Sequence, residues 1–188
     1  VVILFAIAFT VTTDSSIITS ATARELPIYN VDTKENKISL TMICAWNADD
    51  IDSILKTLKD NNVKITFFMV GDWVDKFPEA VKKISDAGHE AFIRSAKSAS
   101  HVPIQWNLDS VDYTGITREE MWKKLENKLS GGSIILMHNG TKHTADSLDM
   151  LIKNIKSKGY DIVTVSNLIY KDGYYIDNNG TQRLNNNV

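Results

Sequence analysis

Short apolar runs alternate along this chain with segments of helical periodicity, and this alternation constrains the fold more than any other feature. The runs that predict buried strands cover residues 38–43, 63–70, 133–137 and 162–165. Apolar side chains at helical spacing predict helices from residue 49 to 58, from Pro78, from residue 117 to about 129, and from 146 to 156. Repeated strand–helix units of this kind predict a parallel sheet with helices outside it.

The remaining segments are assigned from local signals. Residues 90–93 and 102–107 are two further strand candidates. From Lys171 onward the chain is rich in Asn, Gly and Tyr, so we expect an irregular C-terminal tail. No repeat or linker divides the chain after Arg24, and residues 24–188 are therefore predicted to form a single domain.

The first 23 residues have a different character from the rest of the chain. Residues 1–9 are continuously apolar, and small or polar residues follow through Ala23. This pattern is typical of the apolar part of a secretory signal or signal anchor, although a buried strand is the alternative. Because the chain starts with Val1, we expect only part of such a leader in residues 1–23, and we predict export to the bacterial envelope or anchoring there.

Charge and cysteine content limit the possible partners. The net charge is −2, which provides no basic surface for nucleic acid. The single cysteine, Cys44, cannot form an intramolecular disulfide and is expected to be a small buried hydrophobic residue. A membrane partner is expected only through the N-terminal segment, and the sequence indicates no oligomeric state.

Three strand ends carry the groups from which a site could be built, because sites gather at the carboxyl ends of parallel strands. His138 directly follows an apolar strand and could act as a general acid or base, since histidine titrates near neutral pH. Asp112 could orient it if their two strand ends are adjacent. The alternative is that His138 is a turn residue and Asp112 a loop cap.

Several aromatic residues lie near loop ends. Trp46, Trp106 and Tyr113 could stack on sugar rings, or they could be core residues. For Trp73 we favour the core.

The other histidines give weaker signals. A metal site on His138 and His143 is disfavoured, because their loop-like spacing matches no strong ligand motif. His101 is expected to be exposed. His89 follows the end of a helix, where we expect a cationic side chain that complements the helix dipole.

From residue 26 to the tail, the chain resembles the sporulation-associated branch of the polysaccharide deacetylases, which carry the NodB-type domain. The most specific blocks are residues 63–73, 87–90, 103–112 and 133–143. The resemblance implies an α/β fold, a distorted (β/α) barrel with parallel strands and outer helices. It also implies N-deacetylation of chitin-like or peptidoglycan sugars with a divalent metal, usually zinc.

The chain departs from the family pattern where the chemistry should lie. Ile43 stands where the resemblance places the catalytic aspartate, and Ile cannot accept a proton. Arg94 and Ser98 stand at the two histidine ligand positions, and a guanidinium cannot ligate a metal. The Arg-x-Pro motif is missing, and little sequence separates Ser98 from Pro103. The resemblance therefore implies an incomplete barrel, open near residues 94–106, with no metal or other cofactor bound.

Two later motifs of the family remain. The segment Asp109-Ser-Val-Asp112-Tyr113 resembles Asp-x-x-Asp-Trp, and Leu136-Met-His138 resembles the Leu-x-His motif that supplies the general acid. The resemblance makes Asp112 the orienting partner of His138. We therefore predict that their side chains lie within hydrogen-bond reach.

These observations predict a deacetylase homologue of the cell envelope or of sporulation that has lost its hydrolytic activity. One alternative is a module that binds cell-wall glycan, with Trp46, Trp106, Tyr113 and Asp109 as binding residues beside Asp112. Another is an active hydrolase with displaced ligands. The ligands would then be Asp49, Asp50, His138 and His143. The last alternative is a decayed gene product without a selected function.

Overall fold

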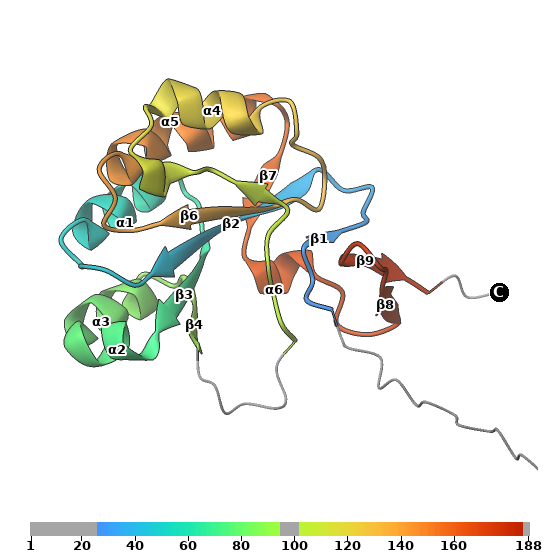
Figure 1. Cartoon of the computed structure of the whole chain (residues 1–188), viewed down its shortest axis with the longest axis horizontal. Coiled ribbons are helices and arrows are strands. Elements are labelled where there is room, and N and C mark those ends of the chain that lie inside the picture. The colour runs from blue at the N-terminus through green and yellow to red at the C-terminus, as the bar shows by residue number, and fades with distance from the viewer. Residues whose placement is uncertain (1–25, 95–101, 186–188) are drawn as a thin grey trace, which may run out of the picture.

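The centre of the molecule is a six-stranded sheet in which every pairing is parallel (Figure 1). The structure is a computed structural model and describes residues 26–94 and 102–185. The strands of this sheet are β2 (Lys37–Cys44), β3 (Thr66–Val70), β4 (Glu90–Arg94), β5 (Leu108–Asp109), β6 (Ile134–His138) and β7 (Asp161–Val163). Their order is β4-β3-β2-β6-β5, and β7 pairs with the first residues of β2. The predicted parallel α/β sheet is confirmed.

The longer helices cover one face of this sheet. The helices are α1 (Ile51–Asp60), α2 (Gly71–Lys76), α3 (Pro78–Asp86), α4 (Arg118–Leu125), α5 (Thr144–Ser157) and the short α6 (Val165–Leu168), with a 3-10 turn, η1 (Asp112–Thr114). The short α6 contacts the other face through Thr66 and Glu90. The main core lies between the longer helices and the strands, where Met42 and Phe67 meet Ile54, Leu151 and Ile155. Trp73 is buried in this core, as predicted. Thr117 and Glu120 form a capping box at the start of α4.

Two rows of side chains cross the other, inner face of the sheet. In the row that we call the lower row, the parallel register aligns Leu136, Thr41, Thr66 and Glu90. Two residues further along each strand, the same register aligns the upper row, which consists of His138, Ile43, Phe68 and Phe92. The upper row therefore lies toward the carboxyl ends of the strands, where sites form in parallel sheets.

The sheet does not close into a barrel within the described residues. Strands β4 and β5 are its two ends, and each pairs with one neighbour only. This opening agrees with the incomplete barrel, open near residues 94–106, that the sequence predicts. The strand predicted at 102–107 was wrong. Ile104 makes only an isolated bridge with Ile28, and the strand begins at Leu108. Ile104 and Trp106 pack against a second hydrophobic cluster.

A second, smaller sheet occupies the side of the molecule away from α1–α3 (Figure 1). It consists of β1 (Asn30–Val31), β9 (Thr181–Leu184) and β8 (Tyr174–Ile176). The expectation of an irregular tail from Lys171 was therefore wrong. The side chain of Asp177 accepts hydrogen bonds from the backbone of Asn179 and Thr181, which orders the turn, and β9 is then fixed by pairing with β1.

The predicted signal or anchor, residues 1–23, lies outside the described residues, as do Ser98 and His101. Among the helices that the structure describes, none is long and apolar enough to span a membrane.

Candidate functional site

Asp112 and His138 form the centre of the candidate site. The Asp112 carboxylate lies 2.8 Å from His138 Nδ1 and accepts a second hydrogen bond, 2.7 Å long, from the His138 backbone N–H. The Thr144 hydroxyl donates a third, also of 2.7 Å. Asp112 is fully buried and the His138 side chain is only slightly exposed. The predicted contact is confirmed, and the pair is buried.

The loop before Asp112 is held in a strained conformation. Val111 has φ of 57°, a left-handed value that is rare for a β-branched residue. The carboxylate of Asp109 stabilises this turn by accepting a hydrogen bond of 2.8 Å from the Val111 backbone N–H. Asp109 therefore acts here as a structural residue that sets the direction of Asp112. Its role in binding a sugar stays a prediction.

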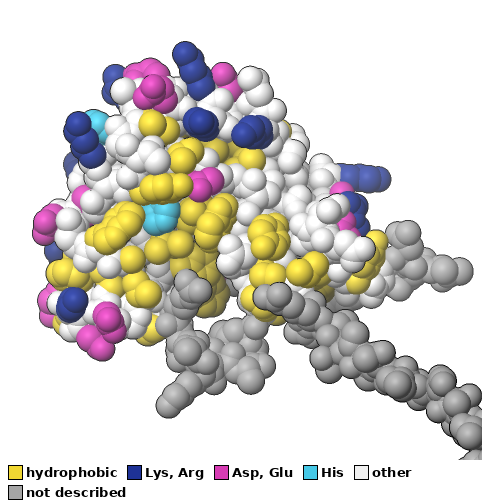
Figure 2. All heavy atoms as spheres, in the orientation of Figure 1, with side chains coloured by type: hydrophobic (Ala, Val, Ile, Leu, Met, Phe, Trp, Pro, Cys, Tyr) yellow, Lys and Arg dark blue, Asp and Glu magenta, His cyan; other side chains and the backbone are white. Residues whose placement is uncertain are grey.

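Two aromatic rings flank His138. The Trp46 ring centroid lies 5.4 Å from the His138 ring, and the Tyr113 ring meets the same imidazole edge-on at 5.5 Å. Both aromatic side chains are about half exposed, at 51% and 53%. Figure 2 shows hydrophobic side chains gathered around a histidine on this face of the molecule. The imidazole is thus framed by apolar rings that remain open to a ligand.

The loop after His138 is fixed by a second carboxylate. Asp50 accepts a hydrogen bond of 2.7 Å from the Gly140 backbone N–H and one of 3.2 Å from the Asn139 side chain. Gly140 has φ of 70°, and a Cβ at this position would come within 2.9 Å of the Asn47 side chain. Asn139 also donates to the Asn47 carbonyl at 2.5 Å. These contacts join the ends of β2 and β6 on either side of Ile43 and His138.

The residues present do not fit a divalent metal ion. Ile43 pairs in register with His138, so an apolar side chain lies beside the imidazole where a carboxylate would be needed. Within residues 26–94 and 102–185, no three His, Cys, Asp or Glu side chains gather closely enough to hold a metal ion. Asp112 and Asp50 already accept hydrogen bonds from backbone groups.

The displaced-ligand set proposed from the sequence does not gather in this structure. His143 is the N-cap residue of α5, and its carbonyl accepts a hydrogen bond from the Ser147 backbone. Asp50 accepts hydrogen bonds from Asn139 and Gly140, while Asp49 is exposed. Together with His138 these residues form no described metal-binding group. Arg94 lies at the end of β4, paired in register with Val70.

Trp106 lies apart from the Asp112–His138 pair. It packs against the second hydrophobic cluster, which includes Ile28 and Ile134. Ile134 is the first residue of β6 and His138 the last, so about 13 Å of strand separates the two levels. Trp106 therefore does not lie beside the pair, and its role in binding a sugar stays a prediction.

Two other residues complete the predicted set. Cys44 is buried and its burial, with a smaller contribution from Asp50, raises the pKa of the thiol, which confirms the prediction of an inert buried residue. The prediction of a cationic His89 was wrong. Burial, helped by the nearby Lys64, lowers the pKa of His89 to about 4, and its Nδ1 accepts a hydrogen bond from the Ile65 backbone.

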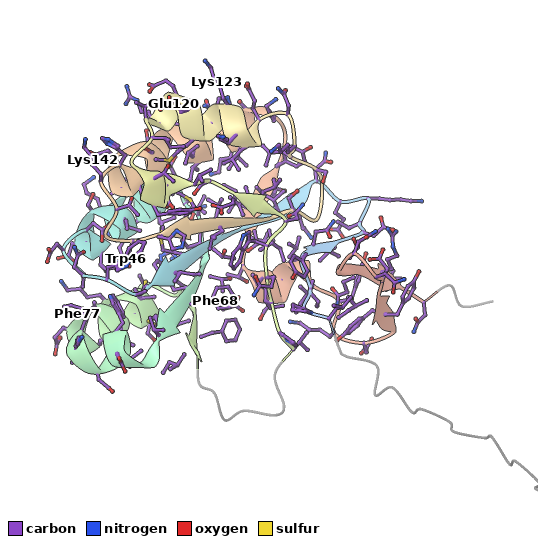
Figure 3. The ribbon with its side chains drawn as sticks, viewed as in Figure 1. Trp46, Phe68, Phe77, Glu120, Lys123 and Lys142 are labelled. Atoms are coloured by element: carbon purple, nitrogen blue, oxygen red, sulfur yellow. The ribbon has the colours of Figure 1, made fainter. Side chains whose placement is uncertain are left out.

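Sequence reasoning missed three residues of this region. Thr144 holds Asp112 through its hydroxyl, and no motif marks it. Phe68 and Phe92 stack on one another in the upper row, with ring centroids 5.7 Å apart and planes inclined by 20°. Figure 3 shows Trp46 beyond the end of β2 and Phe68 beside β3. Counting alternate positions along 66–70 and 90–94 could have placed both phenylalanines on one face of the sheet.

Comparisons with known proteins agree with this geometry. YlxY of Bacillus subtilis (strain 168), an uncharacterized protein, is 25% identical over 193 residues, covering 76% of this chain and 60% of YlxY. A peptidoglycan-N-acetylglucosamine deacetylase of Bacillus cereus is 24% identical over 186 residues, covering 70% of this chain and 68% of that enzyme. The chain therefore spans about three fifths to two thirds of these relatives.

A solved structure shares the fold. BA3943 of Bacillus anthracis, a CE4 family pseudoenzyme, matches with a TM-score of 0.70 at 23% identity, covering 77% of this chain and 69% of that one. The family model for polysaccharide deacetylase matches residues 30–130, which is more than half of the chain. These residues include the Asp112 motif and the Ile43 position. The chain belongs to the polysaccharide deacetylase family.

Proposed function

We propose that this protein is a non-hydrolytic member of the deacetylase family that binds N-acetylated cell-wall glycan. One observation carries the proposal: Ile43 lies in register beside the retained Asp112–His138 pair, and two half-exposed aromatic rings frame that pair. The site therefore has groups that can contact a ligand, but the side chain of Ile43 occupies the position where the reaction needs a base. Peptidoglycan is proposed as the glycan because the Bacillus cereus relative is a peptidoglycan-N-acetylglucosamine deacetylase.

The remaining groups are suited to recognition. Asp112 fixes His138 through Nδ1, so Nε2 is left to hydrogen-bond a sugar hydroxyl or amide. Trp46 and Tyr113 offer apolar faces on which the C–H face of a sugar ring can pack. In the hydrolytic members of such families a metal-activated water attacks with help from a carboxylate base. Without that attack the bond to the leaving group does not break, so a general acid alone does not complete the reaction.

Binding is tested by cosedimentation of the purified protein with insoluble bacterial peptidoglycan. We expect the wild-type protein to sediment and Trp46→Ala to lose roughly tenfold in affinity, because one stacking face is removed. Tyr175→Ala is the matched control, since Tyr175 is an aromatic residue of similar exposure on β8 in the second sheet. A wild-type protein that stays in the supernatant, or equal losses in both variants, would contradict the proposal.

Hydrolysis is tested separately. The protein is incubated with peptidoglycan or chitooligosaccharide in the presence of zinc or cobalt, and released acetate is measured. We expect no release above that of His138→Ala, and no stoichiometric metal by elemental analysis after dialysis. Acetate release by the wild-type protein that His138→Ala abolishes would show that the chain is an active deacetylase.

Loss of activity in this fold can be reversed in a relative. A mutant of BA3943 is a CE4 family pseudoenzyme with restored enzymatic activity. For the present chain we expect Ile43→Asp alone to remain inactive, because Arg94 also stands at a position that the family resemblance assigns to a metal ligand. Acetate release by Ile43→Asp would show that the base was the single missing group.

We also propose that the protein works outside the cytoplasmic membrane, where peptidoglycan lies. The apolar residues 1–9 motivate this location. Fractionation of cells that express the chain from its native gene tests it, and we expect the protein in the envelope or the medium. Recovery in the cytoplasmic fraction would contradict it.

A further inference from the structure

The upper row extends the candidate site across the sheet, and it is not part of the machinery described above. From His138 the register continues through Ile43 to Phe68 and Phe92, one residue on each of four adjacent strands. Neighbouring strands lie about 4.8 Å apart, so the row spans about 14 Å. Ile43, Phe68 and Phe92 are half-buried and the His138 side chain is slightly exposed, so part of each side chain is accessible. The row is thus a continuous, largely aromatic strip that begins at the Asp112–His138 pair.

The accessibility of this strip follows from the open sheet. In a closed barrel the inner face of each strand is covered by the strands opposite, whereas here β4 and β5 are the ends of the sheet among the described residues. The lower row is closed by α6, whose Val165 backbone N–H donates to the Thr66 hydroxyl at 2.8 Å. Nothing comparable is seen above Phe68 in the described parts of the chain. Apolar strips that are accessible in part can serve as ligand surfaces.

The strip also offers apolar contacts that suit the acetylated form of a glycan. The strip itself presents two stacked phenyl rings and an isoleucine. An N-acetyl group brings a methyl group and a neutral amide, whereas a free amino sugar brings an ammonium that this surface would have to desolvate.

From this arrangement we propose that the upper row is a set of further sugar subsites, so that an N-acetylated glycan lies across β6, β2, β3 and β4 with its successive rings on His138, Ile43, Phe68 and Phe92. This inference rests on the proposed function and deepens it, because it fixes the length and the acetylation state of the preferred glycan. The occupant is a glycan because the strip is continuous with the ring-framed His138.

The test uses isothermal titration of the whole protein with N-acetylated chitooligosaccharides from dimer to pentamer. We expect affinity to rise by roughly tenfold between the dimer and the tetramer, because the longer ligand reaches the phenyl rings. Phe92→Leu keeps the apolar volume and should abolish most of this gain while leaving dimer binding unchanged. Phe68→Ala should do the same, and Tyr175→Ala should change neither. Fully deacetylated tetramer should bind at least tenfold more weakly than the acetylated one.

The outcomes separate the two proposals. If no oligosaccharide binds the wild-type protein, the proposed function fails and the subsites fail with it. If the dimer binds but affinity does not rise with length, or Phe92→Leu retains the full gain, the subsites are refuted and the proposed function stands. If the wild-type protein dimerises in sedimentation analysis and Phe92→Leu is monomeric, the strip is a contact between copies and the subsites are refuted. Thermal melting of each variant confirms that it is folded.

Discussion

The lower and upper rows share the same strands and the same face of the sheet, yet they have opposite characters. The lower row is closed and polar: Thr41 and Thr66 are buried, and their hydroxyls donate to the Ile135 carbonyl and to the Glu90 carboxylate. Apart from His138 at its end, the upper row is apolar and accessible in part, with Phe68 stacked on Phe92. Polar groups therefore lie where water is excluded, and apolar groups lie where it has access.

The two rows are therefore subject to different physical constraints. A buried polar group is tolerated only when its hydrogen bonds are satisfied, and α6 completes that set by donating the Val165 N–H to Thr66. The side chains of an accessible apolar strip form no hydrogen bonds with water, and their burial under a ligand is favourable. The lower row is thus expected to determine the stability of the fold, and the upper row to determine what the protein binds.

The largest expected effect on stability comes from placing an aspartate on β2, once in the lower row and once in the upper row. Thr41→Asp places an unpaired carboxylate at a position that is 2% exposed, and should lower the free energy of unfolding by about 4 kcal/mol. Ile43→Asp, two residues further on the same strand, should lower it by only about 1 kcal/mol, because water reaches that position. Urea denaturation of both variants is the measurement. Equal losses of unfolding free energy in the two variants would contradict the difference between the rows.

Removal of the carboxylate that anchors His138 should be the next largest change. Asp112→Ala leaves three donors without their acceptor, and we expect a loss of about 3 kcal/mol in unfolding free energy. Asp52→Ala is the matched control, since Asp52 is an exposed carboxylate paired with Lys83, and should change stability by under about 1 kcal/mol. Similar losses of unfolding free energy for both variants would mean that the buried pair contributes no more to stability than an exposed ion pair.

The hydroxyl that links the lower row to α6 should matter less, but measurably. Thr66→Val removes an acceptor from the Val165 N–H and a donor to Glu90, and should lower unfolding free energy by about 2 kcal/mol. Thr66→Ser keeps the hydroxyl and should lose less than half as much. Chemical denaturation distinguishes them, and a Thr66→Val protein as stable as wild type would show that α6 is held by other contacts.

The smallest expected effect is a dependence of stability on pH. His89 has a pKa of about 4 in the folded protein and about 6.5 when unfolded, so the unfolded chain binds the extra proton first as pH falls. Stability should be unaffected by His89 above about pH 6.5, should decrease toward pH 4, and should level off below it. Melting temperatures of wild type and His89→Gln between pH 7.5 and 4 test this. Parallel curves for the two proteins would refute it.

The sequence predicted those parts of the molecule that depend on local pattern. The strands around Thr41 and Leu136 lie in long apolar runs, and the Asp112–His138 contact followed from family resemblance. The second sheet was missed because β1 and β9 are only two and four residues long and lie about 150 residues apart. Such short strands have no periodicity of their own, and only pairing defines them.

The upper row was missed for a different reason. An apolar run such as residues 63–70 predicts a strand that is buried on both faces, and Phe68 was assigned to that pattern. Exposure of one face arises from strands that the chain lacks, which no local window can reveal. His89 was misassigned in a similar way, because its place after a helix suggested a charge while its packing against Phe67 and Ile65 excludes one.

The left-handed Val111 has a consequence for the thermodynamics of ligand binding. A β-branched residue with φ of 57° persists only where its surroundings fix it, so the loop from Asp109 to Thr114 is restricted to few conformations before any ligand arrives. The carboxylate of Asp112 and the ring of Tyr113 are carried by this loop and lose little conformational entropy when a glycan binds. Association at this site should therefore be fast and nearly rigid, with little change in backbone order between the free and bound protein.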